Sequence, residues 1–282
     1  MVSGNDSAVA LAEFIGGDID NFSSMMNQKA SSLGLTSSYF VTPHGLDQDD
    51  HYTTAFELAK IANYALKNDT FSKIVRTSNY TITINNQPKN LHNTNELLGS
   101  LDGVYGVKTG FTNGANRCLV TACKRGNLDI ICVVLGCDTK KNRTQDSINL
   151  INYTFNNFSV VNVKNIIDKN FDNWVTYETN KITVTKGMSS NLKFCLNESQ
   201  IKFNNIALNN SCLDRIHVSF SLPDNLNAPL LPNSVVGYLT VNINGDDAFS
   251  VDILNTNLVR KKNIFYYLNT FSRDYFSYCY NS

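Results

Sequence analysis

Apolar side chains in the first part of the chain recur at the three- to four-residue spacing of helices. Asp6 or Ser7 can cap a first helix, which ends at Gly16-Gly17 because glycine readily terminates helices. A second helix starts at Asp18. A third follows the stretch Thr54-Ala55-Phe56-Glu57, which is typical of a capping box in front of an apolar stripe.

From Tyr80 onwards the pattern changes to that of strands, in "YTITI", "GVYGVKTG" and "RCLVTACKRGNLDIICVVLG". The last of these predicts a hairpin that turns at Arg125-Gly126-Asn127. A helix over "NRTQDSINLINYTFNNF" then places Ile148, Ile151 and Phe155 on its inner side. Helices followed by strands and a closing helix predict an α+β domain over residues 1–158.

Beyond residue 158 the pattern is nearly all β, with short apolar or alternating runs that Gly, Asn and Pro separate. We expect a small β-sandwich over residues 159–258. Residues 259–282 return to helical spacing behind the basic run Arg260-Lys261-Lys262, with one apolar side made of Ile264, Leu268, Phe271, Tyr275 and Tyr278. Such a helix can lie on an anionic membrane surface or pack on its own domain, and the sequence leaves both open.

Composition narrows the function classes. The formal net charge is zero, which argues against a nucleic-acid partner, and no apolar run is long enough to span a bilayer. The chain as written starts without an export signal. Cys118, Cys123, Cys132 and Cys137 lie in apolar strand-like runs and are expected to be buried free thiols, whereas a Cys195–Cys212 disulfide stays open. No metal-ligand spacing occurs, so we expect neither a metal nor another cofactor.

The first candidate functional residues are Lys108-Thr109-Gly110, which lie at the end of a predicted strand. A lysine on a strand fixes a cation beside a pocket, the threonine offers a hydroxyl to a carboxylate, and glycine lets a ligand approach the backbone. Alone, this triplet is a weak signal. Ser3-Gly4-Asn5 lies upstream, however, and Ser-x-Asn followed by Lys-Thr-Gly is the order found in penicillin-recognising serine enzymes.

With these motifs in order, the chain resembles the low-molecular-mass penicillin-binding proteins, the serine-type D-alanyl-D-alanine carboxypeptidases of peptidase family S11. The resemblance runs through "SGNDSAVALAE", "FVTPHGLD", "HYTTAFELAKIANYAL", "NTNELL" and "GVYGVKTGFT". It implies a β-lactamase/transpeptidase-like catalytic domain, then the family's β-rich second domain and an amphipathic membrane anchor. It also implies an extracytoplasmic location, peptidoglycan stem peptides as substrate and β-lactams as ligands, with no nucleic acid.

The resemblance also assigns roles to individual residues. Ser3 and Asn5 would relay protons and hold the substrate amide, and Lys108 would lend positive charge to that network. Thr109, beside Gly110, would bind the terminal carboxylate of the D-Ala-D-Ala stem peptide, and the backbone N–H of Phe111 would be one oxyanion-hole donor. Arg143 would help to orient the same carboxylate, although a solvated surface arginine is the alternative.

We expect structural roles, not catalytic ones, for the histidines of this sequence. His44 and Asp47 lie in "PHGLD", where we expect hydrogen bonding within the loop in preference to catalysis. His51, His92 and His217 show no partner spacing and are interpreted as surface or satisfied residues.

The nucleophile motif of the family, Ser-x-x-Lys, is expected some tens of residues before Ser-x-Asn, where this sequence has only two residues. Ser190/Lys193 and Ser199/Lys202 match the spacing, but both lie in the β-rich part without a helix signal, and we reject them. We therefore expect a carboxypeptidase that lacks its first part and does not react with penicillin by itself. The alternatives are a non-catalytic cell-wall or membrane-surface binding module and, with less support, a β-lactamase.

Overall fold

The structure is a computed structural model that describes the backbone of residues 2–280 and the side chains of residues 2–213 and 215–273. It divides into two compact units, Met1–Asn157 and Phe158–Ser282.

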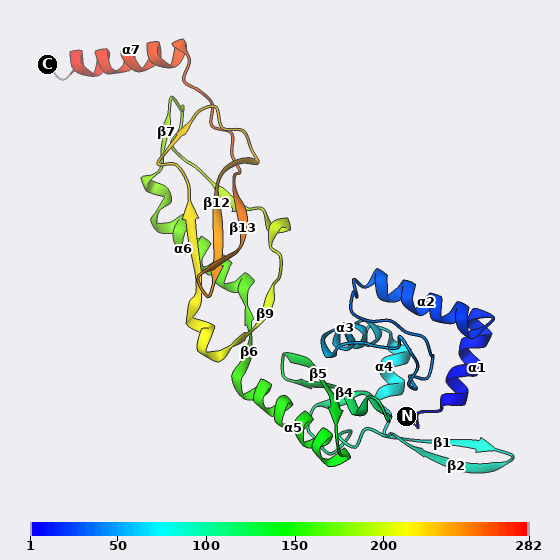
Figure 1. Ribbon diagram of the computed structural model, residues 1–282. Helices are drawn as coiled ribbons and strands as arrows, with labels where there is room; N and C mark the ends of the chain where they lie inside the picture. The colour runs from blue at the N-terminus through cyan, green and yellow to red at the C-terminus, as the bar shows by residue number, and fades with distance from the viewer. Residues whose placement is uncertain (1, 281–282) are drawn as a thin grey trace. The chain divides into compact units, whose positions relative to one another are not determined.

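The first unit combines five helices with two antiparallel sheets among the described residues (Figure 1). Its helices are α1 (Asn5–Gly16), α2 (Ile19–Ser32), α3 (Ala55–Ala65), α4 (Asp69–Arg76) and α5 (Lys140–Asn157). Its strands are β1 (Asn79–Ile84), β2 (Gln87–His92), β3 (Val104–Thr112), β4 (Asn116–Arg125) and β5 (Leu128–Cys137).

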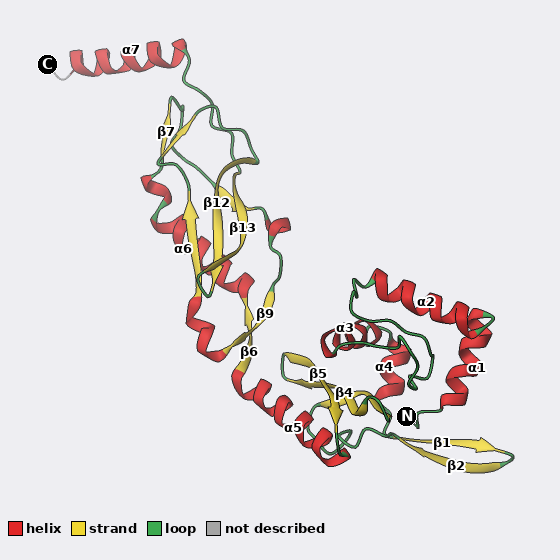
Figure 2. Ribbon diagram, viewed as in Figure 1, coloured by secondary structure: helices red, strands yellow, loops and turns green. Residues whose placement is uncertain are grey.

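The sheet that carries the Lys-Thr-Gly triplet has the order β3-β4-β5, and β1 and β2 form a separate hairpin (Figure 2). Helix α5 packs on β4 and β5, and its buried Ile151 joins Leu119 and Cys123 in one apolar core. Ile148 and Phe155 pack against that core, as the sequence predicts. Helices α3 and α4 contact β5 and β3 respectively.

The second unit is built around a four-stranded antiparallel sheet in the order β10-β12-β13-β8. Its strands are β6 (Phe158–Asn162), β7 (Thr183–Thr185), β8 (Phe194–Leu196), β9 (Asn205–Asn209), β10 (Ile216–Ser221), β11 (Asn225–Asn227), β12 (Ser234–Ile243) and β13 (Asp246–Asn255). Short 3₁₀ segments cover Thr179–Lys181, Glu198–Gln200 and Asn210–Arg215, and the helices are α6 (Val163–Tyr177) and α7 (Ile264–Tyr280).

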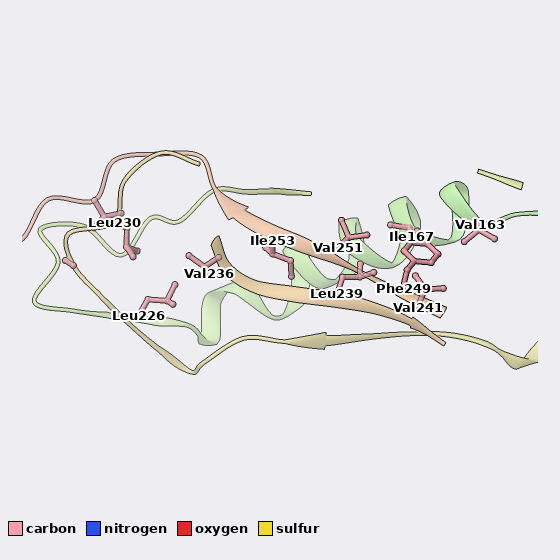
Figure 3. Close-up of a cluster of buried hydrophobic side chains, with 12 residues drawn as sticks. Val163, Ile167, Leu226, Leu230, Val236, Leu239, Val241, Phe249, Val251 and Ile253 are labelled. Carbon is pink, nitrogen blue, oxygen red and sulfur yellow. The ribbon is translucent and has the colours of Figure 1, made fainter. Parts of the chain in front are cut away.

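Helix α6 corrects the expectation that the part beyond residue 158 is nearly all strand. The side chain of Asn162 accepts a hydrogen bond from the Asn165 N–H and caps the helix. Val163 and Ile167 are fully buried against β12 and β13 (Figure 3). The helix thus supplies the layer that a second sheet supplies in a sandwich. Its apolar positions are interleaved with Asn and Asp, which hid the helical period in the sequence.

Two predicted helix starts differ in detail. Helix α1 begins at Asn5 with Gly4 as its cap, not at Asp6 or Ser7, and Gly4 makes no side-chain cap bond. The Thr54 hydroxyl does accept from the Glu57 N–H, at 3.2 Å. The Glu57 carboxylate does not return to Thr54; instead it accepts from the N–H groups of Thr36 and Ser37.

Cysteines 118, 123, 132, 137, 195 and 212 are all free thiols, so the structure contains no Cys195–Cys212 disulfide. Cys123 and Cys132 are buried, as predicted, and burial raises the pKa of the Cys132 thiol to about 11. Cys118 and Cys137 are only half-buried, because both lie where β4 and β5 approach the end of the sheet. Within residues 2–280, no helix combines the length and apolar character needed to cross a bilayer.

Candidate active site

The Lys-Thr-Gly triplet lies in β3, and Lys108 reaches from there to the start of the chain. Its ammonium group donates to the Ser3 hydroxyl at 2.9 Å, joining residues 105 positions apart, and it also donates to the Thr109 carbonyl. Partial burial lowers the pKa of Lys108 from its ordinary value of 10.5, because a charged ammonium is less stable away from water. The structure therefore brings together two of the residues that the sequence singled out.

Ser3 and Asn5 are positioned by the start of helix α1. Ser3 has a φ of 60°, in the left-handed region that favours glycine. Such backbone conformations persist where the surroundings hold them, and they are frequent at functional sites. Asn5 is the first residue of α1 and is half-buried.

Ser3, Asn5 and Lys108 line one cavity of about 480 Å³ in the first unit. Its wall also includes Thr109, Gly110, Phe111, Cys118 and the loop residues Thr42, Pro43, His44, Gly45 and Leu46. The volume is within the range of sites that take small ligands. Phe111 is half exposed, and the guanidinium of Arg117 lies 4.0 Å from its ring centre.

Thr109 meets a segment that the sequence analysis did not single out as functional. Its hydroxyl lies 2.6 Å from the hydroxyl of Thr94. The next residue, Asn95, is buried and donates from its side chain to the Gly106 carbonyl at 2.9 Å. The segment therefore runs beside β3, the strand that pairs only with β4 within the described sheet. Its sequence signals were the dense polar run "NTNE" directly before two leucines and the place of "NTNELL" among the stretches that resemble the family.

Arg143 is not the solvated surface residue that the sequence left open. It lies in α5, is 3% exposed, and donates to the Glu96 carboxylate at 2.7 Å. It is absent from the residues that line the 480 Å³ cavity. The Thr144 hydroxyl donates to the same carboxylate oxygen of Glu96. These contacts hold the pKa of Glu96 below its ordinary value, although the desolvation of Glu96 opposes them.

The loop that carries His44 and Asp47 is held by hydrogen bonds within the loop and to the β3–β4 turn. His44 Nδ1 accepts from the Leu46 N–H, and Asp47 accepts from the Gly114 N–H at 2.9 Å. Hydrogen bonds from Thr112 and Gly114 lower the pKa of Asp47. His51 Nδ1 accepts from the Val41 N–H, and burial lowers its pKa. Within the described residues, no group of three or more His, Cys, Asp or Glu side chains could hold a metal ion.

Both Ser-x-x-Lys matches lie in the second unit. Ser190 is in a loop, and Ser199 is in the three-residue 3₁₀ segment Glu198–Gln200. Neither serine starts an α-helix that would place its lysine one turn further on, beside the hydroxyl.

A Ser-x-Asn triplet that meets the lysine of Lys-Thr-Gly at one cavity resembles the arrangement in penicillin-recognising serine enzymes, in which both motifs occur. Residues 1–139 match the peptidase S11 family, described as D-alanyl-D-alanine carboxypeptidase. The first half of the chain is therefore similar to the D-alanyl-D-alanine carboxypeptidase family.

Individual relatives agree with this assignment. The chain is 30% identical to D-alanyl-D-alanine carboxypeptidase DacF of Bacillus subtilis, over 87% of this chain and 60% of that protein. It is 30% identical to DacA of Haemophilus influenzae, over 94% of this chain and 64% of that protein. Penicillin-binding protein 5 of Haemophilus influenzae has a similar structure, with a TM-score of 0.61 and 29% identity over 92% of this chain and 72% of that one. The chain thus spans less than two thirds of the length of these curated relatives.

Proposed function

We propose that these residues serve a serine-type D-Ala-D-Ala carboxypeptidase, which removes the terminal D-alanine of peptidoglycan stem peptides through an acyl-enzyme. The single observation that carries the proposal is the Lys108–Ser3 hydrogen bond at the wall of the cavity. Two D-alanyl-D-alanine carboxypeptidases, each 30% identical to this chain, support the choice of substrate.

In this proposal the described residues hold the substrate and move protons. Lys108 keeps a positive charge next to Ser3, so that the serine hydroxyl can pass a proton between reacting groups. Asn5 holds the substrate amide, and the N–H of Phe111 donates to the oxyanion. The Thr109 hydroxyl, with Arg143, binds the terminal carboxylate of the peptide or the equivalent carboxylate of a β-lactam. The nucleophile would come from a Ser-x-x-Lys helix that is not among the described residues.

A stereospecific binding measurement tests the substrate class. The full chain is titrated with diacetyl-L-lysyl-D-alanyl-D-alanine and with the diastereomer that ends in two L-alanines, and backbone amide NMR signals of β3 are followed. We expect the D,D peptide to shift the signals of Lys108 to Phe111 and the L,L peptide to leave them in place. Equal shifts with both peptides, or none, would contradict the proposal.

We also propose an extracytoplasmic, membrane-associated location, with residues 159–258 as a separate β-rich domain and residues 259–282 as its tail. The support is the exposed apolar surface of α7 behind the basic run, where Ile264, Phe265 and Leu268 are each more than half exposed. The side chains of Tyr275 and Tyr278 lie outside the described residues. Flotation with phosphatidylglycerol vesicles tests this, and Phe265→Ser with Leu268→Ser should abolish the binding.

A further inference from the structure

The three consecutive residues Thr94, Asn95 and Glu96 connect the two proposed carboxylate contacts. Thr94 meets the Thr109 hydroxyl in β3, and Glu96 meets the Arg143 guanidinium in α5. Asn95, between them, is 2% exposed and holds the segment to β3 through the Gly106 carbonyl. Because two residues of chain span only about 7 Å, groups from different elements are kept near each other by one short rigid segment.

The ion pair between Glu96 and Arg143 is incomplete on both sides. Its hydrogen bond runs from one terminal nitrogen of Arg143 to Glu96 Oε1. Among the described residues, Arg143 Nε is buried without any partner, and Glu96 Oε2 accepts no hydrogen bond. Lys140 Nζ, at 3.9 Å from Oε2, is too far away to donate one. A guanidinium can bind a carboxylate through two parallel N–H bonds, so a bonding position on Arg143 is left unused.

Of the two partners, Glu96 is the more exposed. The arginine side chain is 4% exposed, whereas the glutamate side chain is 30% exposed. The part of this pair that solvent touches therefore belongs to the glutamate, although Glu96 Oε2 is itself buried. A carboxylate that came to Arg143 would have to displace Glu96 or share the guanidinium with it.

We propose that Glu96 is an internal carboxylate that exchanges with the terminal carboxylate of the substrate on Arg143. The inference rests on the proposed function, because that function supplies the carboxylate-ended peptide. In the state described here, Glu96 compensates the buried charge of Arg143. When the peptide binds, its carboxylate takes the guanidinium and Glu96 turns towards solvent. Glu96 is thus a positioning residue that weakens the binding of carboxylate-ended ligands and favours their release.

An alternative is that the pair only ties α5 to the segment before β3. In that case Glu96 would affect stability but not the affinity for a carboxylate. The two roles differ in one measurable respect, which is the response of Arg143 Nε to a free carboxylate.

The experiment follows the Nε–Hε NMR signal of Arg143 in the full chain, assigned with Arg143→Lys. The probe is N-acetyl-D-alanine, and N-acetyl-D-alaninamide is the control that lacks the carboxylate. We expect only the acid to shift the signal. In Glu96→Gln, which keeps the size and one acceptor of the side chain, we expect the acid to bind about fivefold more tightly, the effect of removing one competing partly exposed charge. Lys140→Gln removes a neighbouring charge without touching the Arg143 contact, and we expect it to leave the glutamate's competition intact.

The outcomes separate this inference from the proposed function. If the acid shifts the amide signals of Lys108 and Thr109 but not Arg143 Nε in the wild-type chain, the exchange and the carboxylate contact of Arg143 are both wrong, whereas the substrate class of the proposed function stands. The exchange is also wrong if Glu96→Gln lowers the melting temperature without changing the affinity. If N-acetyl-L-alanine shifts Arg143 Nε as strongly as the D isomer, the exchange holds and the D-alanine specificity of the proposed function fails. Because the wild-type titration needs no variant to fold, the test gives an answer in every case.

Discussion

The ammonium group of Lys108 and the hydroxyl of Ser3 are joined by a 2.9 Å hydrogen bond between β3 and the residues just before α1. If this pair binds and orients an anionic peptide, Lys108→Gln should weaken the binding of diacetyl-L-lysyl-D-alanyl-D-alanine about tenfold, as expected for one charged hydrogen bond. Calorimetric titration of the folded chain measures this. An unchanged dissociation constant would remove Lys108 from the site.

The lowered pKa of Lys108 adds a pH dependence. The lysine is charged below its pKa, so the affinity for the carboxylate-ended peptide should fall as the pH rises through that lowered value, before the ordinary value of 10.5 is reached. Lys108→Arg is the matched variant, because arginine stays charged over this range. Its affinity should be flat where that of the wild-type chain falls, and a parallel decline in both would exclude Lys108 as the titrating group.

Penicillin tests whether the described residues include a nucleophile. Both Ser-x-x-Lys matches, at Ser190 and Ser199, lie outside α-helices in the second unit. We therefore expect no covalent adduct when the purified chain is incubated with a fluorescent penicillin and examined by mass spectrometry. If a labelled chain is found, Ser190→Ala and Ser199→Ala identify whether either serine carries the adduct.

Glu57 should make the first unit sensitive to acid. Its carboxylate accepts from Ser38, Thr36 and Ser37, and these hydrogen bonds lower its pKa. A folded-state pKa below 4.5 means that Glu57 contributes stability above pH 4.5, and this contribution is lost as the pH falls through the lowered value. Glu57→Gln should therefore have a lower free energy of unfolding than the wild-type chain at neutral pH. In acid, below the lowered pKa of Glu57, the two chains should be equally stable.

The matched control for Glu57 is Glu13→Gln, which changes an exposed carboxylate on α1. Urea titrations at neutral pH and below pH 4.5 compare the two variants. If Glu13→Gln and Glu57→Gln change stability equally at both pH values, the buried hydrogen bonds of Glu57 are not the cause.

Helix α6 should be essential to the stability of the second unit. Ile167 is fully buried against β12 and β13, so Ile167→Ala should lower the free energy of unfolding by about 2–5 kcal/mol. Leu231→Ala, at a side chain that is 60% exposed, should change it by less than about 0.5 kcal/mol. Urea unfolding monitored by the fluorescence of Trp174, which packs against this core, measures both.

Local patterns predicted the elements whose signals lie within a few residues. The β4–β5 hairpin pairs Arg125 with Leu128, so it turns at Gly126-Asn127, within the predicted stretch. Asp18 caps α2, and the predicted inner side of α5 does face the core. Helix α6 was missed because only its contacts with β12 and β13, distant in sequence, show which of its side chains are buried.

In the candidate site, too, the residues that could be predicted differ from those that depend on contacts distant in sequence. Lys108 and Ser3 could be paired from motif order, because the resemblance supplied a long-range relation that spacing alone does not contain. The segment Thr94–Glu96 could not be assigned to the site, since its side chains act through partners in β3 and α5. Glu57 was predicted as half of a capping box, but the turn at residues 36–38 offered stronger donors.

The loop that forms one wall of the cavity is anchored along its length. Its two ends meet at the β-bridge between Tyr39 and Tyr52. Between them, His51 accepts a hydrogen bond from the Val41 N–H, and Asp47 accepts one from the Gly114 N–H. A ligand that enters beside Lys108 therefore meets a surface that is already ordered. Little conformational entropy remains to be lost from that wall on association, so affinity there reflects how well the ligand's groups match the cavity. For the same reason, the rate of association is set by diffusion and orientation and does not wait for the loop to close.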